Sequence, residues 1–172
     1  MEQTIRPRPS AVWTILVGGA LAATSAATFA VLDELALAGA ATGIAALTLL
    51  VAGWSARQMG APRVRFVGSL LERAVDAAIL GSLAWALLPT RPGVAALVAL
   101  SGSYVAAYVR VKGEGLGFEV RAWALAWPLA MAALTVGLVA GAVEAGLWGA
   151  AAISIAAALA RSLEVRGQGE PA

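Results

Sequence analysis

The chain alternates between long apolar runs and short polar segments. Each complete run has about the 17–25 residues that an α-helix needs to cross a bilayer. The first run resembles the core of a signal peptide, but further runs follow it, so we expect it to stay uncleaved. The pattern predicts six transmembrane helices at residues 11–32, 35–56, 68–88, 94–111 and 122–143, with a shorter, tilted or partly buried sixth helix ending near Ala160.

Composition agrees with this pattern. Hydrophobic residues make up 60% of the chain and charged residues 13%, and the mean hydropathy is +0.83. Soluble domains average about 45–50% apolar and about 25% charged residues. The surplus of apolar residues must therefore face lipid. We predict an all-α integral membrane protein, a six-transmembrane-helix bundle that forms a single membrane domain over residues 1–172.

Cysteine and histidine are both missing from the sequence. Their absence excludes disulfides, zinc sites, thiol nucleophiles and histidine-based acid–base catalysis. Any chemistry must use carboxylates, arginine, lysine, hydroxyls or a metal held by oxygen atoms. Neither a separate soluble domain nor a nucleic-acid partner is expected.

Basic residues predict the orientation in the membrane, because cytoplasmic loops carry an excess of Lys and Arg. With residues 1–10 and the tail 161–172 both in the cytoplasm, only Arg91 lies outside, together with the acids Asp33, Glu34 and Glu144. The high Ala and Arg content is typical of GC-rich bacterial genomes, so we expect a bacterial cytoplasmic membrane. The cytoplasmic basic residues would be Arg6, Arg8, Arg57, Arg63, Arg65, Arg73, Arg110, Lys112, Arg121, Arg161 and Arg166.

Three charged residues, Glu72, Arg73 and Asp76, lie in the first turns of the third predicted span. Charges within membrane helices are costly and are functional by default. Glu72 and Asp76 are four residues apart, so their like charges share one helical face. A metal ion, a basic partner or a bound proton must compensate them, unless this part of the helix simply lies among the wet headgroups.

A second group of polar residues closes the fourth predicted span. Tyr104 and Tyr108 share a face, while Arg110 and Lys112 bring cations to the surface that also carries Arg57. Clustered cations at that depth suit a phosphate or a lipid headgroup. The alternative is an ordinary interfacial tyrosine belt with basic flanks.

Two segments, LLVAGWSAR at 49–57 and GSLLERAVD at 68–76, resemble the two halves of a known signature. It reads D-x-x-D-G-x-x-A-R, a spacer of eight residues, then G-x-x-x-D-x-x-x-D, and belongs to the CDP-alcohol phosphatidyltransferases. The later segment SYVAAYVRVKGEGLG resembles the SYxRARAEGLG stretch of that family's bacterial members. The resemblance is clearest over residues 49–121. The matching signature positions are Gly53, Ala56, Arg57, Gly68 and Asp76.

Several departures from that signature bear on activity. Leu49 and Ala52 occupy the first two Asp positions, Glu72 occupies the third, and the spacer has ten residues. Residues 123–128, WALAWP, replace a charged E-R stretch that the family often has at the start of helix five. No motif is therefore complete.

The resemblance implies a six-helix, dimeric membrane enzyme of phospholipid biosynthesis. Such enzymes transfer a phosphatidyl-type group from a CDP-linked lipid to an alcohol with the help of Mg²⁺ or Mn²⁺. It implies an incomplete metal site at Glu72 and Asp76, with Asp76 as the base that deprotonates the acceptor. It further implies a substrate site at Gly53, Ala56, Arg57, Gly68, Arg110 and Lys112.

Because two of the four carboxylates are missing, we expect no pair of metal ions, and catalysis that is weakened or lost. Glu72 and Asp76 should face a cavity between the second and third helices, with a nearby Arg neutralising them, Arg57 or Arg110 being the favoured candidates, or with one acid keeping its proton. The first hypothesis is a catalytically silent homologue that keeps a lipid or nucleotide cleft or assists an active paralogue. One alternative is an active one-metal transferase. Another is an unrelated six-helix protein such as a transporter, which would be expected to show an inverted repeat.

Overall fold

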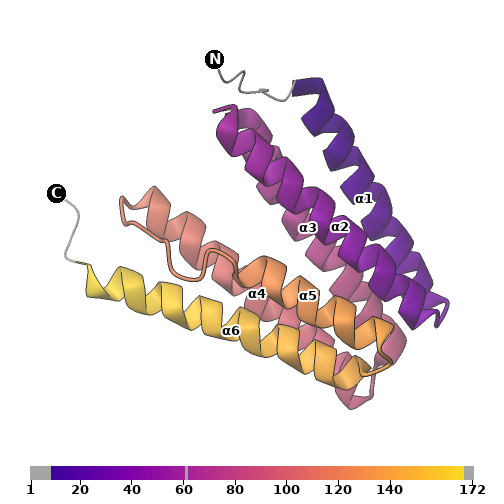
Figure 1. The fold of residues 1–172 in the computed structure, drawn as a ribbon. Coiled ribbons are helices and arrows are strands. Elements are labelled where there is room, and N and C mark those ends of the chain that lie inside the picture. The colour runs from indigo at the N-terminus through magenta and orange to yellow at the C-terminus, as the bar shows by residue number, and fades with distance from the viewer. Residues whose placement is uncertain (1–8, 61, 169–172) are drawn as a thin grey trace.

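The computed structural model describes residues 9–60 and 62–168, and the described part is helical without any strand. Short turns join most of the helices, whereas a longer irregular segment, 116–125, precedes the fifth. The all-helical fold expected from the apolar pattern is therefore confirmed. The helices are α1 (Pro9–Val31), α2 (Leu35–Gln58), α3 (Pro62–Leu87), α4 (Arg91–Gly115), α5 (Ala126–Val139) and α6 (Val143–Gly167) (Figure 1).

Four of these helices are long and apolar enough to cross a membrane, namely α1, α2, α4 and α6. Helix α3 is as long as the others but carries the charges of its first half, and α5 has only 14 residues. Large apolar side chains such as Trp54, Trp85 and Leu159 are exposed on the outside of the bundle. Exposed apolar surface of this extent is compatible with a membrane protein.

Several predicted helix ends are wrong. The basic segment 57–67, expected to be a loop, is mostly helix, because α2 continues to Gln58 and α3 begins at Pro62. Proline is favoured in the first turn of a helix, where its missing N–H has no partner to lose. Helix α5 starts four residues later than expected, at Ala126, and is the shortest helix.

The sixth helix is also longer than predicted. It continues to Gly167, so much of the expected tail 161–172 is helical, and residues 169–172 lie outside the described part. Charged residues mark the point where an apolar span ends, but they do not end a helix, because the backbone hydrogen bonds continue regardless of side-chain polarity.

The helices form two groups of three. In the first group α1 packs on both α2 and α3, and in the second α6 packs on both α4 and α5; α2 with α5, and α3 with α4, join the groups. Figure 1 shows the groups closest where α3 turns into α4 and spread apart towards the chain termini. If the chain were a repeat of three helices, α4 would correspond to α1 and would contact both other helices of its group. Among the described residues α6 takes that central position instead, so the packing is not that of a repeat.

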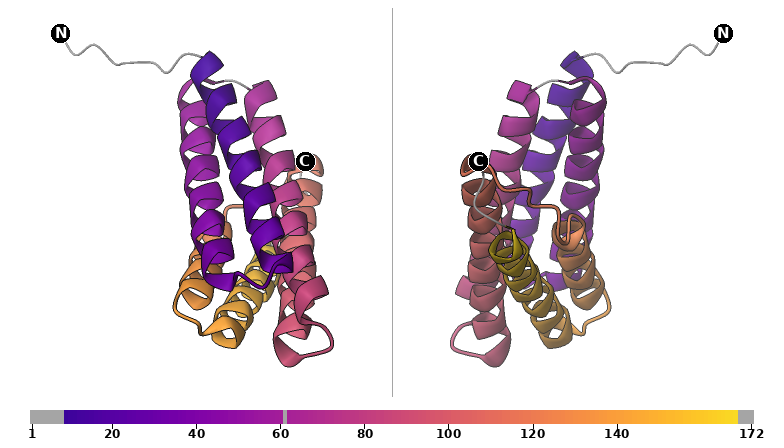
Figure 2. Two further views of the ribbon diagram at one scale, coloured as in Figure 1. Left: turned by 90° about the vertical axis from the view of Figure 1, so that its right-hand side faces the viewer. Right: turned by 90° about the vertical axis from the view of Figure 1, so that its left-hand side faces the viewer.

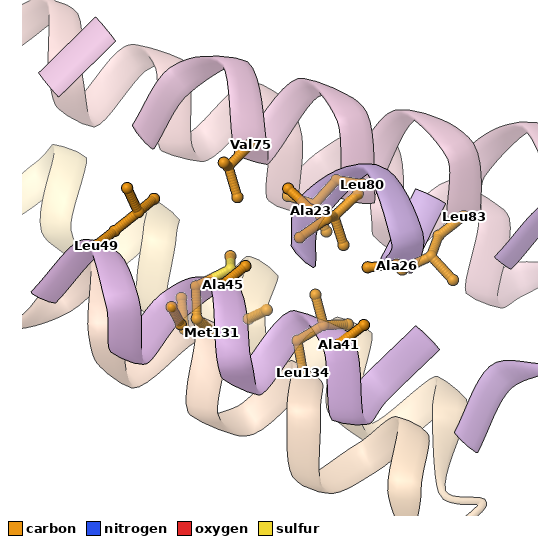
Figure 3. Packing of buried hydrophobic residues seen from close by; sticks show 14 of the residues in the cluster. Ala23, Ala26, Ala41, Ala45, Leu49, Val75, Leu80, Leu83, Met131 and Leu134 are labelled. Atoms are coloured by element: carbon orange, nitrogen blue, oxygen red, sulfur yellow. The ribbon is translucent and has the colours of Figure 1, made fainter. Parts of the chain in front are cut away.

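Small residues allow the helices to approach closely. A Cβ atom on Gly39 of α2 would lie 2.7 Å from the Cβ of Leu138 in α5, and one on Gly102 of α4 would lie 3.1 Å from the Cβ of Ser154 in α6. Alanine dominates the buried positions, and larger residues such as Leu80 and Leu134 fill the space between α1, α2, α3 and α5 (Figure 3). Interfaces built from small residues are typical of helices that associate within lipid.

The alternating direction of the helices gathers the basic residues at one end. The end of α2, the beginning of α3 and the ends of α4 and α6 point to the same side of the bundle, away from the turn between α3 and α4 (Figure 2). Arg91 begins α4 at the opposite end, where Asp33 lies in the turn after α1 and Glu144 in the first turn of α6. Arg6 and Arg8 lie outside the described residues.

Candidate functional site

A cavity of about 160 Å³ opens at the basic end, between α1, α2, α3 and α4. Arg57 reaches it from the last turn of α2, Glu72 from α3 and Arg110 from α4, so three helices bring charged side chains to one space. Its complete lining is Leu16, Leu49, Ala52, Gly53, Arg57, Val64, Gly68, Ser69, Glu72 and Arg110.

The deeper part of this cavity is apolar. Leu49 and Ala52, which stand where the resemblance expects metal-binding Asp residues, both line it and are buried. Neither side chain offers an oxygen ligand. Three of the residues that match the signature, Gly53, Arg57 and Gly68, therefore line the cavity, while Leu49 and Ala52 leave its buried part without charge.

Asp76 lies outside the cavity and is the fully buried member of a polar network. Its exposed fraction is 0%. Its Oδ1 accepts a hydrogen bond from the indole Nε1 of Trp127 at 2.7 Å, and its Oδ2 accepts one from the hydroxyl of Ser103. The same Oδ2 lies 2.8 Å from Nη1 of Arg73. Both carboxylate oxygens are thus occupied by groups of the chain itself.

Arg73 is the cation at the centre of this network. Besides pairing with Asp76, its Nη1 donates to the hydroxyl of Ser103 at 2.5 Å and to the Ser103 carbonyl at 3.1 Å. Its Nη2 lies 3.9 Å from a carboxylate oxygen of Glu72. The hydroxyl of Tyr104 donates to the carbonyl of Arg73 at 3.0 Å. The network therefore connects α3 with α4 and, through Trp127, with α5.

This arrangement corrects two expectations about the acids. Glu72 lines the cavity, but Asp76 points towards α4 and α5, because it lies one turn deeper, where those helices close over α3. The cation that pairs with Asp76 is Arg73 and not Arg57 or Arg110. Arg73 lies three residues before Asp76 on the same helix, so this pair can form whatever the arrangement of the other helices.

The predicted substrate residues divide between two places. Gly53, Arg57, Gly68 and Arg110 line the cavity, and Ala56 is buried beside it. Arg110 also pairs with Glu114 at 2.9 Å on the exposed side of α4.

Lys112 is not part of the cavity. It lines a separate groove between α4 and α6. Lys112 lies at the expected end of the bundle but does not share the cavity with Arg57 and Arg110, because two residues along a helix turn the side chain to nearly the opposite face.

A magnesium or manganese ion, which the resemblance implies, does not fit the residues present. Within the described part of the chain no three Asp or Glu residues gather into a possible metal site. Glu72 is the one carboxylate in the cavity lining, and the oxygens of Asp76 are engaged elsewhere. Mg²⁺ requires near-octahedral oxygen coordination. One carboxylate next to two guanidinium groups is a poor site for a divalent cation.

Sequence reasoning missed three polar residues that the structure makes important. Ser103 and Trp127 bind Asp76, and Arg161 is buried in α6 although it was expected in a solvated tail. The Arg161 guanidinium donates to the carbonyls of Ala106, Ala122 and Trp123 at 2.8, 3.2 and 3.2 Å. It ties α6 to α4 and to the segment before α5. Ser103 stood next to Tyr104 in the quoted motif, but nothing in the pattern indicated its partner.

Comparison with known proteins adds no relative. No protein-family model matches this chain, and a search of curated proteins finds no match. The resemblance to CDP-alcohol phosphatidyltransferases therefore depends on the motif residues alone.

Proposed function

We propose that this chain is a membrane-embedded homologue of CDP-alcohol phosphatidyltransferases that binds a phosphate-bearing lipid or nucleotide headgroup without metal-dependent transfer. One observation carries the proposal. Arg57, from the first half of the signature, and Arg110, from the later segment 103–117, line a single cavity at the basic end of the bundle. Arginine is favoured in phosphate recognition because its planar guanidinium can donate two hydrogen bonds at once.

The charges and size of the cavity favour a phosphate group as the ligand. The lining itself carries two guanidinium groups against the one carboxylate of Glu72, while Glu114, outside the lining, pairs with the Nε of Arg110. The volume of about 160 Å³ equals the share of about five waters in the liquid. This space suits a headgroup phosphate better than a whole nucleotide-lipid, whose remainder would lie towards the solvent or the lipid.

The buried network argues against retained transferase activity. A base must come within hydrogen-bond reach of the hydroxyl that it deprotonates. Asp76 is fully buried and bound to Arg73, Ser103 and Trp127, so it cannot meet an acceptor alcohol in the cavity. Phosphoryl transfer depends on electrostatic stabilisation of the developing charge, usually by metal ions. An active one-metal enzyme would have to rely on Glu72.

The proposal places all six helices in a bacterial cytoplasmic membrane with both termini in the cytoplasm. In this orientation the cavity faces the side where soluble nucleotides are found. A silent binding protein is most useful next to an active enzyme, so the proposed assembly is a homodimer or a heterodimer with a paralogue that has all four Asp residues.

Binding of CDP-diacylglycerol to the purified protein in detergent tests the cavity. Arg57→Gln and Arg110→Gln should each weaken binding by about tenfold or more, since a hydrogen bond to a charged group contributes about 1.5–3 kcal/mol. Arg63→Gln is the matched control, because Arg63 is an exposed cation at the same end of α3 but outside the cavity lining. Its affinity should change less than about twofold. Equal losses in all three variants, or no binding by the wild type, would refute the proposed site.

Release of CMP tests the loss of activity separately. The wild type should release no CMP from CDP-diacylglycerol with Mg²⁺ or Mn²⁺ and glycerol 3-phosphate or inositol phosphate as acceptor. Calorimetric titration should likewise show no tight binding of two metal ions. Metal-dependent CMP release, or a titration that shows two bound ions, would refute the proposed loss of transferase activity. Neither result would bear on headgroup binding in the cavity.

A further inference from the structure

A second concave surface lies on the outside of the bundle, between α4 and α6. It is a groove of about 260 Å³ at the basic end, and its walls are largely apolar. Its polar side chains are those of Tyr108, Lys112 and Ser162. The complete lining is Tyr108, Val109, Lys112, Gly113, Leu116, Ser162 and Val165.

We propose that this groove binds an anionic glycerophospholipid, whose phosphate lies on the Lys112 ammonium and whose acyl chain follows the seam between α4 and α6. The charge of the groove supports this occupant. Lys112 forms no ion pair within the described residues, whereas neighbouring Arg110 is paired with Glu114 and Arg121 with Glu119. An unpaired cation at the membrane interface attracts an anionic headgroup.

The surface below the groove is suited to an acyl chain. Val105 lies seven residues before Lys112, two turns deeper on the same side of α4, and Leu159 lies one turn before Ser162 on α6. These side chains are 52% and 60% exposed, and Ile155 continues the apolar track another turn down. Gly102 allows α4 to lie close to Ile155, since a Cβ atom on Gly102 would lie 3.3 Å from the Cγ1 of Ile155. A headgroup site thus continues into a hydrocarbon path.

This lipid site is independent of the proposed headgroup cavity. No residue lines both, and Arg110 and Lys112 lie on nearly opposite sides of α4. Loss of one site can therefore be measured while the other remains.

Lys112 is the sole lysine of the chain, so an amine-reactive reagent reports on the groove at a single side chain. The N-terminal amine, which is expected on the same face, serves as an internal reference. The full-length protein is reconstituted in nanodiscs of phosphatidylglycerol or of phosphatidylcholine and treated with an amine-acylating reagent. Mass spectrometry then follows acylation at each amine. Relative to the N-terminus, Lys112 should react at least about fivefold more slowly in phosphatidylglycerol.

Two variants separate the groove from the general surface charge. Ser162→Phe fills the groove but keeps Lys112, so the protection should be lost, whereas Arg63→Gln removes an interfacial cation elsewhere and should leave it unchanged. Equal rates in the two lipids, or protection that survives in Ser162→Phe, would overturn the proposal. If Ser162→Phe does not fold, Lys112→Gln is compared with Arg63→Gln by native mass spectrometry. Only Lys112→Gln should lose retained phosphatidylglycerol, and equal retention would overturn the proposal.

Discussion

Replacing Arg73 by Met is the most informative perturbation of the buried network. The side chain of Asp76 is 0% exposed, and its Oδ2 lies 2.8 Å from the Arg73 guanidinium, so the substitution leaves a buried carboxylate without a cation. Unit charges about 4 Å apart interact with about 4 kcal/mol at an effective dielectric constant of about 20. Removing one partner of a buried pair typically costs about 3–5 kcal/mol. The hydrogen bonds from Ser103 and Trp127 remain, so we expect about 3 kcal/mol.

A double-mutant cycle distinguishes this pairing from simple loss of packing. Asp76→Asn should cost about 1–2 kcal/mol, because an amide can still accept the Trp127 hydrogen bond. Once Asn replaces the carboxylate, Arg73→Met no longer isolates a charge. The double variant should therefore be more stable than Arg73→Met alone, with a coupling energy of about 2–3 kcal/mol.

Unfolding in mixed micelles with a denaturing detergent, followed by circular dichroism, provides the free energies. The exposed pair Arg110–Glu114 is the matched control, and its cycle should give about 0.3–0.5 kcal/mol. Additive effects of Arg73→Met and Asp76→Asn, or a coupling no larger than that of the control pair, would refute the reasoning.

Three further predictions concern topology and packing. A reporter fused after Arg166 should read cytoplasmic and one near Arg91 external; the reverse would contradict the proposed orientation. Arg161→Met should cost about 1.5–3 kcal/mol and increase hydrogen exchange in residues 116–125, because it removes hydrogen bonds to three carbonyls. Gly39→Val should destabilise the α2–α5 contact by about 1–3 kcal/mol in the same unfolding assay, whereas Gly81→Ala, with open space around it, should not destabilise.

The helical fold could be predicted because a helix long enough to cross a bilayer appears in the sequence as an uninterrupted apolar run. The same signal cannot show where a helix continues into solvent. Arg57 and Arg161 ended the predicted spans, yet α2 and α6 continue beyond them. Helix α5 shows the opposite error, since residues 122–125 are apolar but form turns. Apolar side chains do not by themselves distinguish a helix from a turn, and Trp123 and Leu125 are exposed in this one.

The candidate site could be predicted only in part, for a related reason. Spacing placed Arg57 and Arg110 at the same end, and the fold brings them to one cavity. Spacing could not show that Asp76 turns away from Glu72, because this depends on α4 and α5 closing over α3. Trp127 contributes a single N–H from an otherwise apolar segment, and no sequence pattern distinguishes a tryptophan that binds a carboxylate from one that faces lipid.

The missing carboxylates and the Arg73 pair are physically connected. A buried acid such as Asp76 must be neutralised in every state of the protein, whether or not a ligand is present. A divalent ion can do so only where enough oxygen ligands surround it, and Leu49 and Ala52 leave too few. Arg73 supplies a cation that cannot dissociate, with Ser103 and Trp127 completing the hydrogen bonds. The bundle is thus held together without a metal. Arg57, together with the part of the Arg110 guanidinium that Glu114 does not engage through Nε, remains at the cavity for an anionic ligand.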